Sequence, residues 1–263
     1  MRLRIGDGEI EYDVRGQGPV VLFLHAFPLG MFMWDDVARD LQADHTVLRF
    51  DCRGFGGSPA GDGPLSMERI ADDAVVLLDH LGLGQALVAG CSMGGYAAFA
   101  MLRRHPDRLR GLLLQNTRAT PDAPEARAGR ALLAEKVLAD GAVAAADAFL
   151  PRLLGETTLR KREAIAANTR ARILKTAPRG IANALLGLGS RADSTPTLRE
   201  IRVPTFVLGG AEDVLTPPAE IEALARAIAG ARCRILPECG HLPSLETPSA
   251  YNHAMRAFLS EAR

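Results

Sequence analysis

A serine flanked by glycines is the residue of this chain best placed for chemistry. Ser92 lies in the stretch VAGCSMGGYAAF (88–99), which contains a G-x-S-x-G pattern. An apolar run typical of a buried strand precedes the serine, and a helical pattern follows it. A sharp strand-to-helix turn would hold the serine at positive φ, and Gly90 and Gly94 would relieve crowding around it. This context predicts a nucleophilic serine; the alternative is a tight turn whose serine has no chemical role.

A serine hydroxyl is a weak nucleophile unless a base and an orienting acid support it. The candidate base is His241, on a glycine-flanked loop after a predicted strand. The candidate acid is Asp213, on a loop directly after another strand, and the adjacent Glu212 is its rival. A satisfied loop histidine and a solvated carboxylate are the alternatives. The order serine, aspartate, histidine along the chain, each after a strand, favours a catalytic triad.

Attack on a carbonyl group places negative charge on its oxygen, which requires N–H donors already in position. The backbone N–H of Met93, next after the serine, is the first predicted donor. The second is the N–H of Phe27, in the loop HAFPLG (25–30), for which a plain strand-to-helix connection is the alternative. His25 is expected to brace this loop.

Two further loops contribute candidates around this site. In PLGMFMW (28–34), the apolar side chains of Met31 and Trp34 either line a substrate pocket or pack in the core, and the pattern favours neither. The glycines of DCRGFGGS (51–58) resemble a phosphate-binding loop, but neither G-x-G-x-x-G nor G-x-x-x-x-G-K-[ST] is present. A turn-rich loop that packs near HAFPLG is therefore favoured.

Short apolar runs alternate with helical patterns along most of the chain. Six runs have the nearly continuous apolar character of strands buried in a parallel sheet: 20–24, 46–51, 86–90, 111–116, 204–210 and 232–238. Residues 66–83 are one of the intervening helical patterns, with Ser66 as its N-cap and Gly82 at its end. The first residues predict an antiparallel hairpin that turns near Gly6–Gly8. Together these elements predict an α/β fold with a mostly parallel sheet.

One interval breaks this alternation. Residues 117–200 contain no strand pattern and are too many for a structureless loop. Helical patterns fill the interval. We therefore expect an all-helical insertion at 117–200 in a core formed by 1–116 and 201–263.

The composition excludes several classes of function. Lys and Arg number 31 and so do Asp and Glu, and aromatic residues make up only 5%, so neither nucleic acid nor a membrane surface is an expected partner. The N-terminus lacks the apolar stretch of a signal peptide, and the four cysteines form no C-x-x-C pair. These features predict a cytoplasmic protein with reduced thiols. The six histidines lack metal-binding spacing, so no metal site is expected, and no pattern specifies an oligomeric state.

Several segments resemble those of alpha/beta-hydrolase fold proteins, over nearly the full chain: LHAFPLGMFMWDD, FDCRGFGGS, GCSMGG, GAEDVLTPP and CGHLPSLETP. Within that superfamily the chain resembles the branch of 3-oxoadipate enol-lactonases and cofactor-free haloperoxidases and esterases. This likeness is carried by HAFPLG…MW, SMGG, LLLQNTRA and STPTLREIRVP. The resemblance implies an eight-stranded sheet, a helical cap at 117–200, and the triad and N–H donors named above. The family often has glycine where this chain has Ala26.

This resemblance implies hydrolysis of a small carboxylic ester or lactone through an acyl-enzyme, with no cofactor and a small-molecule substrate as the partner. The same triad could instead serve perhydrolysis with peroxide or C–C bond hydrolysis of a diketone. A ligand-binding protein that kept the fold is the third hypothesis. Serine at position 92 disfavours the dehalogenases and epoxide hydrolases of this fold, which use an aspartate nucleophile.

Overall fold

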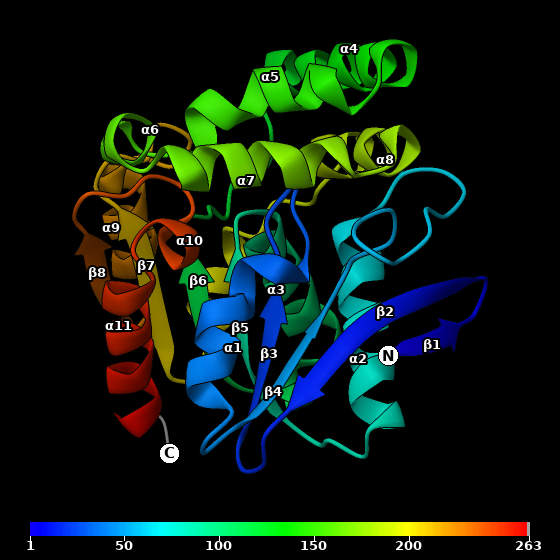
Figure 1. Ribbon diagram of the computed structural model, residues 1–263. Coiled ribbons are helices and arrows are strands. Elements are labelled where there is room, and N and C mark those ends of the chain that lie inside the picture. Colours follow the sequence, from blue (N-terminus) through cyan, green and yellow to red (C-terminus); the bar gives the residue numbers. More distant parts are fainter. Residues whose placement is uncertain (262–263) are drawn as a thin grey trace.

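The computed structural model describes residues 1–261, and one eight-stranded sheet runs through it. The strand order is β1-β2-β4-β3-β5-β6-β7-β8 (Figure 1). All pairings from β4 to β8 are parallel, whereas β2 is antiparallel to both β1 and β4. The strands are β1 (Arg2–Ile5), β2 (Gly8–Arg15), β3 (Val20–Leu24), β4 (Thr46–Phe50), β5 (Ala86–Cys91), β6 (Leu109–Gln115), β7 (Thr205–Gly210) and β8 (Arg232–Leu236).

All six predicted parallel strands and the N-terminal hairpin are confirmed, with one difference in burial. The last strand, β8, has exposed residues at Arg232, Cys233 and Arg234, although its sequence reads as a strand buried on both faces. The reason is its place at the edge of the sheet, where it pairs only with β7.

Helices cover both faces of the sheet. They are α1 (Asp35–Leu41), α2 (Met67–His80), α3 (Met93–Arg104), α9 (Pro218–Arg226), α10 (Pro243–Glu246) and α11 (Pro248–Glu261), with 3-10 helices η1 (Met31–Trp34), η2 (Pro106–Arg108) and η3 (Pro196–Glu200). Alternate side chains of β3 enter two apolar clusters. Leu22 and Leu24 pack in the cluster that contains α2 and α3, and Val21 and Phe23 in the cluster that contains α1 and α11. The sheet is thus the middle of three layers.

The helix before β5 begins and ends as its sequence predicts. Ser66 accepts a hydrogen bond from the backbone N–H of Arg69 at 3.1 Å, as an N-cap does. Gly82, just past the end of α2, adopts φ +66°, which is the left-handed conformation that favours glycine.

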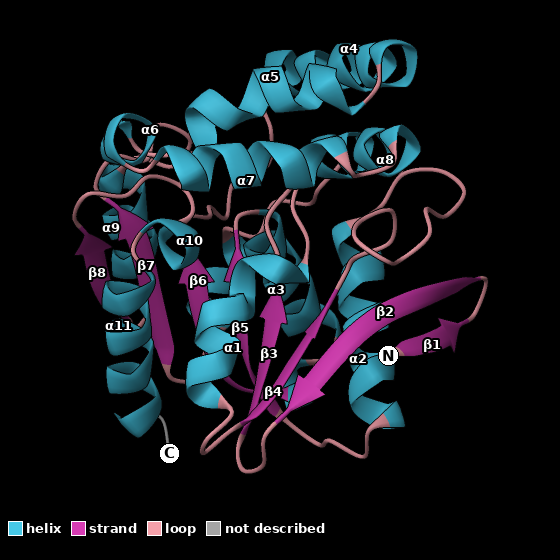
Figure 2. Cartoon of the chain, viewed as in Figure 1, coloured by secondary structure: helices cyan, strands magenta, loops and turns pink. Residues whose placement is uncertain are grey.

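Five α-helices separate β6 from β7 and lie beyond the carboxyl ends of the parallel strands (Figure 1). They are α4 (Pro124–Asp140), α5 (Ala142–Leu153), α6 (Glu156–Lys161), α7 (Glu163–Leu174) and α8 (Pro178–Gly189). In this layer α4 packs on α8 and α5 packs on α7. Figure 2 shows only helices and loops in this layer.

None of the helices within residues 1–261 combines the length and the apolar character that crossing a bilayer requires.

Candidate active site

The turn at Ser92 joins the end of β5 to the start of α3. Ser92 has φ 53° and ψ −110°, so the predicted positive φ is confirmed. A Cβ atom on Gly90 would lie 2.3 Å from the carbonyl oxygen of Gly94, which explains the first glycine. A Cβ atom on Gly94 would lie 2.1 Å from the carbonyl oxygen of Leu24. The second glycine therefore lets α3 approach strand β3.

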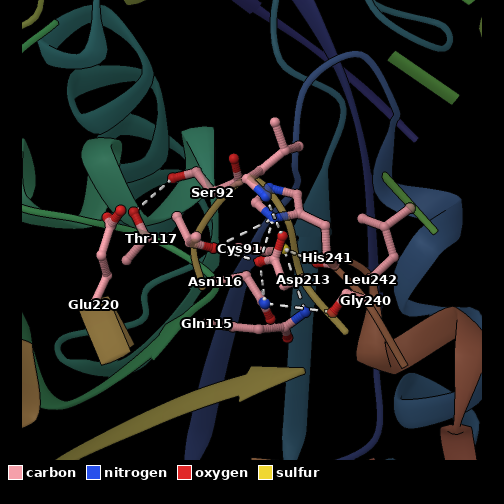
Figure 3. Close-up of polar contacts among 12 residues, drawn as sticks. Cys91, Ser92, Gln115, Asn116, Thr117, Asp213, Glu220, Gly240, His241 and Leu242 are labelled. Atoms are coloured by element: carbon pink, nitrogen blue, oxygen red, sulfur yellow. Dashed lines mark hydrogen bonds and ion pairs between the residues drawn. The ribbon is translucent and has the colours of Figure 1, made fainter. Parts of the chain in front are cut away.

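The imidazole of His241 faces the carboxylate of Asp213. His241 Nδ1 lies 2.7 Å from Asp213 Oδ2, and the two residues are only 2% and 3% exposed (Figure 3). Ser92 and His241 line the same cavity. The contact with Asp213 occupies Nδ1, which leaves Nε2 as the ring nitrogen available to a serine hydroxyl. The structure thus brings together the three residues that the sequence analysis selected.

The carboxylate of Asp213 accepts further hydrogen bonds. Asn116 Nδ2 donates to it at 2.6 Å, the N–H of Leu215 donates at 2.8 Å, and the hydroxyl of Thr216 also donates. Burial alone would raise the pKa of Asp213, but the charge of His241 and these hydrogen bonds outweigh burial and lower that pKa below its usual value. Asp213 is therefore ionised near neutral pH, as an orienting acid must be.

Glu212, the rival acid, points to a different partner. Its carboxylate accepts the N–H of Thr157 at 2.8 Å and also the hydroxyl of Thr157, at the first turn of α6. This contact ties the loop after β7 to the helical layer. The structure therefore pairs His241 with Asp213 rather than with its neighbour.

Asn116 is a positioning residue that the sequence analysis missed. It follows β6 at φ 45°, and its Nδ2 donates to Asp213 Oδ2 and, at 3.4 Å, to the carbonyl oxygen of Gly240. The amide therefore spans the loops that carry the acid and the histidine. An asparagine directly after a strand was the available signal, because asparagine tolerates the left-handed region.

Glu246 is a second missed residue, and it holds the loop around His241. Its buried carboxylate accepts three backbone N–H groups: from Gly155 at 2.7 Å, Gly240 at 2.9 Å and Leu242 at 3.0 Å. The last two flank His241 in the chain. A glutamate five positions past the histidine gave no sequence signal, because most such carboxylates are solvated.

The two predicted N–H donors belong to the residue after the nucleophile and to a residue of the same cavity. Met93 is the first residue of α3, and Phe27 lines the cavity with Ser92. Within residues 1–261, neither backbone N–H donates to a protein acceptor. Unpaired N–H groups are expected in the first turn of a helix, and a ligand oxygen can accept from them.

His25 braces the loop that carries Phe27, as predicted. The N–H of Cys52 donates to His25 Nε2 at 2.9 Å, so Nδ1 carries the proton and donates to the carbonyl oxygen of Ala26 at 3.0 Å. Burial lowers the pKa of His25, which keeps the ring neutral. The imidazole therefore joins the 25–30 loop to the 51–58 loop, and the two loops pack together.

The structure does not place Met31 and Trp34 beside Ser92, which corrects the pocket prediction. Trp34 is fully buried, with ring-centroid distances of 4.9 Å to Phe23 and 6.1 Å to Tyr251. Met31 lines a separate cavity of about 350 Å³, and its N–H donates to Asp51 at 2.7 Å. The physical reason is the 3-10 helix η1, which turns these side chains away from the nucleophile and, for Trp34, into the core.

The cavity at Ser92 measures about 410 Å³, within the range of small-molecule sites. Helices α4, α5 and α8 contribute to its walls, together with residues that follow β3, β5 and β7. Its larger apolar side chains are Phe27, Tyr96, Leu133, Phe149, Leu153, Leu188 and Leu215. Among residues 1–261, no three His, Cys, Asp or Glu side chains form a group that could hold a metal ion.

Known proteins share this architecture. A thermophilic esterase from Thermogutta terrifontis, solved with malate bound, is 39% identical with a TM-score of 0.97 and covers 100% of this chain and 99% of its own. The 3-oxoadipate enol-lactonase 2 of Acinetobacter baylyi is 29% identical over 96% of this chain and 94% of its own length. A provisionally named non-heme bromoperoxidase of Mycobacterium tuberculosis is 28% identical over 97% of this chain and 98% of its own length.

These relatives are of the kinds that the sequence segments resemble, so the resemblance is confirmed. The family model for the alpha/beta hydrolase fold matches residues 19–248, which span the sheet from β3 onward and the helical layer. The chain therefore belongs to the alpha/beta hydrolase fold family.

Proposed function

We propose that the protein is a serine hydrolase that cleaves a small carboxylic ester or lactone through an acyl-enzyme intermediate. The observation that carries the proposal is that Ser92 and His241 line one cavity while His241 Nδ1 lies 2.7 Å from Asp213. The esterase and enol-lactonase relatives support this class of reaction. The substrate is a small molecule, in keeping with a cavity of about 410 Å³.

The first half of the proposed reaction acylates the enzyme. His241 takes the proton of Ser92 as the hydroxyl oxygen attacks the carbonyl carbon. Asp213 holds the imidazole in the required tautomer and stabilises the imidazolium. The N–H groups of Met93 and Phe27 donate to the oxyanion. His241 then gives its proton to the departing alcohol oxygen, which in a lactone stays attached to the acyl group.

The second half releases the acid. A water molecule gives a proton to His241 and attacks the acyl carbon, and the same N–H groups stabilise the second oxyanion. The bond to Ser92 breaks as His241 returns the proton to the serine oxygen. These steps require no metal and no organic cofactor.

The chain divides, in this proposal, into a catalytic core of residues 1–116 and 201–263 and a helical cap of residues 117–200. The core supplies the triad and the N–H donors. The cap contributes side chains such as Leu133 and Leu188 to the walls of the cavity, and it would therefore select the substrate.

The proposal is tested with the purified chain and p-nitrophenyl butyrate. The wild-type protein should hydrolyse this ester, and Ser92→Ala should reduce kcat by a factor on the order of 10⁴ or more, because the nucleophile is lost. Ser260→Ala, at an exposed position of α11, is the matched control and should keep full activity. A fluorophosphonate probe followed by peptide mapping should label Ser92. Full activity in Ser92→Ala, or no labelling of folded protein, would contradict the proposal.

Perhydrolysis is the second candidate, and the relative named as a bromoperoxidase favours it. In this reaction hydrogen peroxide replaces water in the second half and leaves with the acyl group as a peracid. Addition of peroxide to a reaction with acetate should then yield peracetic acid at a rate that depends on Ser92. A rate of peracid formation equal in wild type and Ser92→Ala would exclude this activity.

A further inference from the structure

The cavity beside Ser92 carries a cluster of basic side chains that the proposed chemistry does not use. Arg118, Arg130, Arg152 and Arg191 all line it, whereas Asp122 is its only acidic lining residue within the part of the chain that the structure describes. Arginine is the side chain best suited to binding a carboxylate, because its planar guanidinium can donate two parallel hydrogen bonds.

Three of these arginines already have acidic partners. Asp122, whose side chain is 7% exposed, pairs with both Arg130 and Arg191, the latter at 2.7 Å. Arg191 also lies over the ring of Tyr96 at 4.4 Å. Arg118 pairs with Glu220 at 3.1 Å. These contacts fix the three guanidinium groups in the protein.

Arg152 differs from the other three. Its residue is exposed at the C-terminal end of α5, and within residues 1–261 its guanidinium has no hydrogen-bond acceptor and no acidic partner. Its backbone is nevertheless fixed close to the triad, because the carbonyl oxygen of the next residue, Leu153, accepts the N–H of His241 at 3.1 Å. Arg152 is thus a free cation held beside the proposed base.

The charges around the cavity do not balance. Within residues 1–261, the four guanidinium groups that line the cavity pair with two carboxylates, those of Asp122 and Glu220. The ionised carboxylate of Asp213 lies behind His241, so one positive charge remains in excess. Low-dielectric walls concentrate the field of the excess positive charge inside a cleft, which raises the local concentration of anions and lowers that of cations. The apolar walls meanwhile suit the hydrocarbon part of a ligand.

We infer that the substrate of this enzyme is an ester or lactone that carries a carboxylate, and that Arg152 is the specificity residue that binds this carboxylate. The inference rests on the proposed function, because it concerns the same cavity. A carboxylate bound there would place one more negative charge among the arginines. A neutral ester of the same length would leave Arg152 without a partner.

The test compares matched esters that differ in charge. Mono-4-nitrophenyl glutarate and 4-nitrophenyl hexanoate have acyl chains of similar length, and only the glutarate carries a carboxylate. In the second pair, 4-acetoxybenzoate and 4-methylphenyl acetate, the carboxylate of the first ester lies in the leaving group. In at least one pair the wild-type kcat/KM should be higher for the anionic ester. Arg152→Gln should lower that kcat/KM about tenfold, chiefly through KM, and change the value for the neutral ester less than twofold. Added salt should reproduce part of this loss by screening.

Two variants make the comparison specific. Arg234→Gln removes an exposed arginine of β8 that lies outside the cavity, and it should leave both esters unaffected. Arg152→Lys keeps the positive charge but not the planar fork, and should restore part of the preference.

The outcomes distinguish the role inferred for Arg152 from the proposed hydrolase function. If the wild type hydrolyses the neutral esters but Arg152→Gln leaves the anionic-to-neutral ratio unchanged in both pairs, the inference is overturned and the proposed function stands. If the wild type hydrolyses none of the four esters, the proposed function fails and the inference fails with it.

Discussion

The two sides of the cavity are built differently. On the sheet side, the carboxylate of Asp213 has four hydrogen-bonding partners and that of Glu246 has three, and both residues are buried. On the cap side, Arg152 is exposed and has no acceptor among residues 1–261. Hydrogen bonds therefore fix the carboxylates on the sheet side, while one charged group on the cap side has no partner among residues 1–261.

The elements behind each side explain this difference. The sheet side follows strands such as β5 and β7, in which every residue is buried. On the cap side, the long helix α4 buries only Ala134 and Val137, and its Leu132 and Leu138 are exposed. Close-packed strands resist displacement of the loops they carry. Substitutions on the sheet side should therefore lower kcat, whereas those on the cap side should change substrate preference or stability.

The largest effect should come from the orienting acid. Asp213→Asn removes the charge that favours the required tautomer of His241, so kcat should fall by a factor on the order of 10⁴. The adjacent Glu212→Gln is the matched control, because its side chain contacts Thr157 rather than the imidazole. Its kcat should stay within about tenfold of wild type. Initial rates with p-nitrophenyl butyrate measure both variants.

The opposite ranking would contradict this assignment. A large loss in Glu212→Gln with little loss in Asp213→Asn, both well folded, would mean that the glutamate orients the histidine during turnover.

An intermediate effect, on stability, is expected on the cap side. Burial alone would raise the pKa of Asp122, but Arg130 and Arg191 outweigh it and lower that pKa below its usual value. A lowered pKa contributes stability that is present above the pKa of the unfolded chain, about 3.9, and is lost as the pH falls through the folded value. Asp122→Asn should therefore cost about 1–3 kcal/mol of unfolding free energy at pH 7 and less at pH 3.

Urea unfolding followed by the fluorescence of Trp34, the single tryptophan, measures this difference at each pH. Asp107→Asn changes an exposed aspartate whose side chain forms no ion pair within residues 1–261, and it should behave as wild type. A destabilisation of Asp122→Asn that stayed constant from pH 7 to pH 3 would show that the ion pairs do not cause it.

The smallest effect should come from the thiol next to the nucleophile. Cys91 is fully buried beneath the turn, burial raises the pKa of its thiol, and it does not line the cavity. Such a thiol is unreactive. Cys91→Ala should therefore keep kcat within about twofold, because the thiol contacts the backbone carbonyl of His241 and the amide of Gln115 but not the imidazole. If turnover fell by orders of magnitude while the circular dichroism spectrum was preserved, residue 91 rather than 92 would face the substrate.

Local patterns predicted most of the core. The apolar run 20–24 became β3 without change, and the N-cap at Ser66 and the glycine at 82 bound α2 as expected. These features depend on residues close in sequence, so their periodicity and capping residues can be recognised in the sequence. The exposure of β8 could not be predicted from its sequence, because the position of a strand in a sheet depends on all the other strands.

The site was predictable where strain or chain order marked it. Ser92 was marked by its glycines, and the order of the candidates along the chain pointed to Asp213 and His241. No local sequence pattern singled out Asn116 and Glu246, because these side chains contact loops that are distant in sequence. Residues of this kind become visible only in three dimensions.

The sequence by itself determined the order of strands and helices, the turn that carries Ser92, and the shortlist of acids for His241. The tertiary structure alone decided that Asp213 rather than Glu212 faces the imidazole, that Trp34 packs in the core, and that four arginines meet at one cavity. The physical reason is that backbone conformation follows from local sterics and periodicity. The direction of a loop side chain, by contrast, depends on the partner that the rest of the fold places within hydrogen-bonding distance.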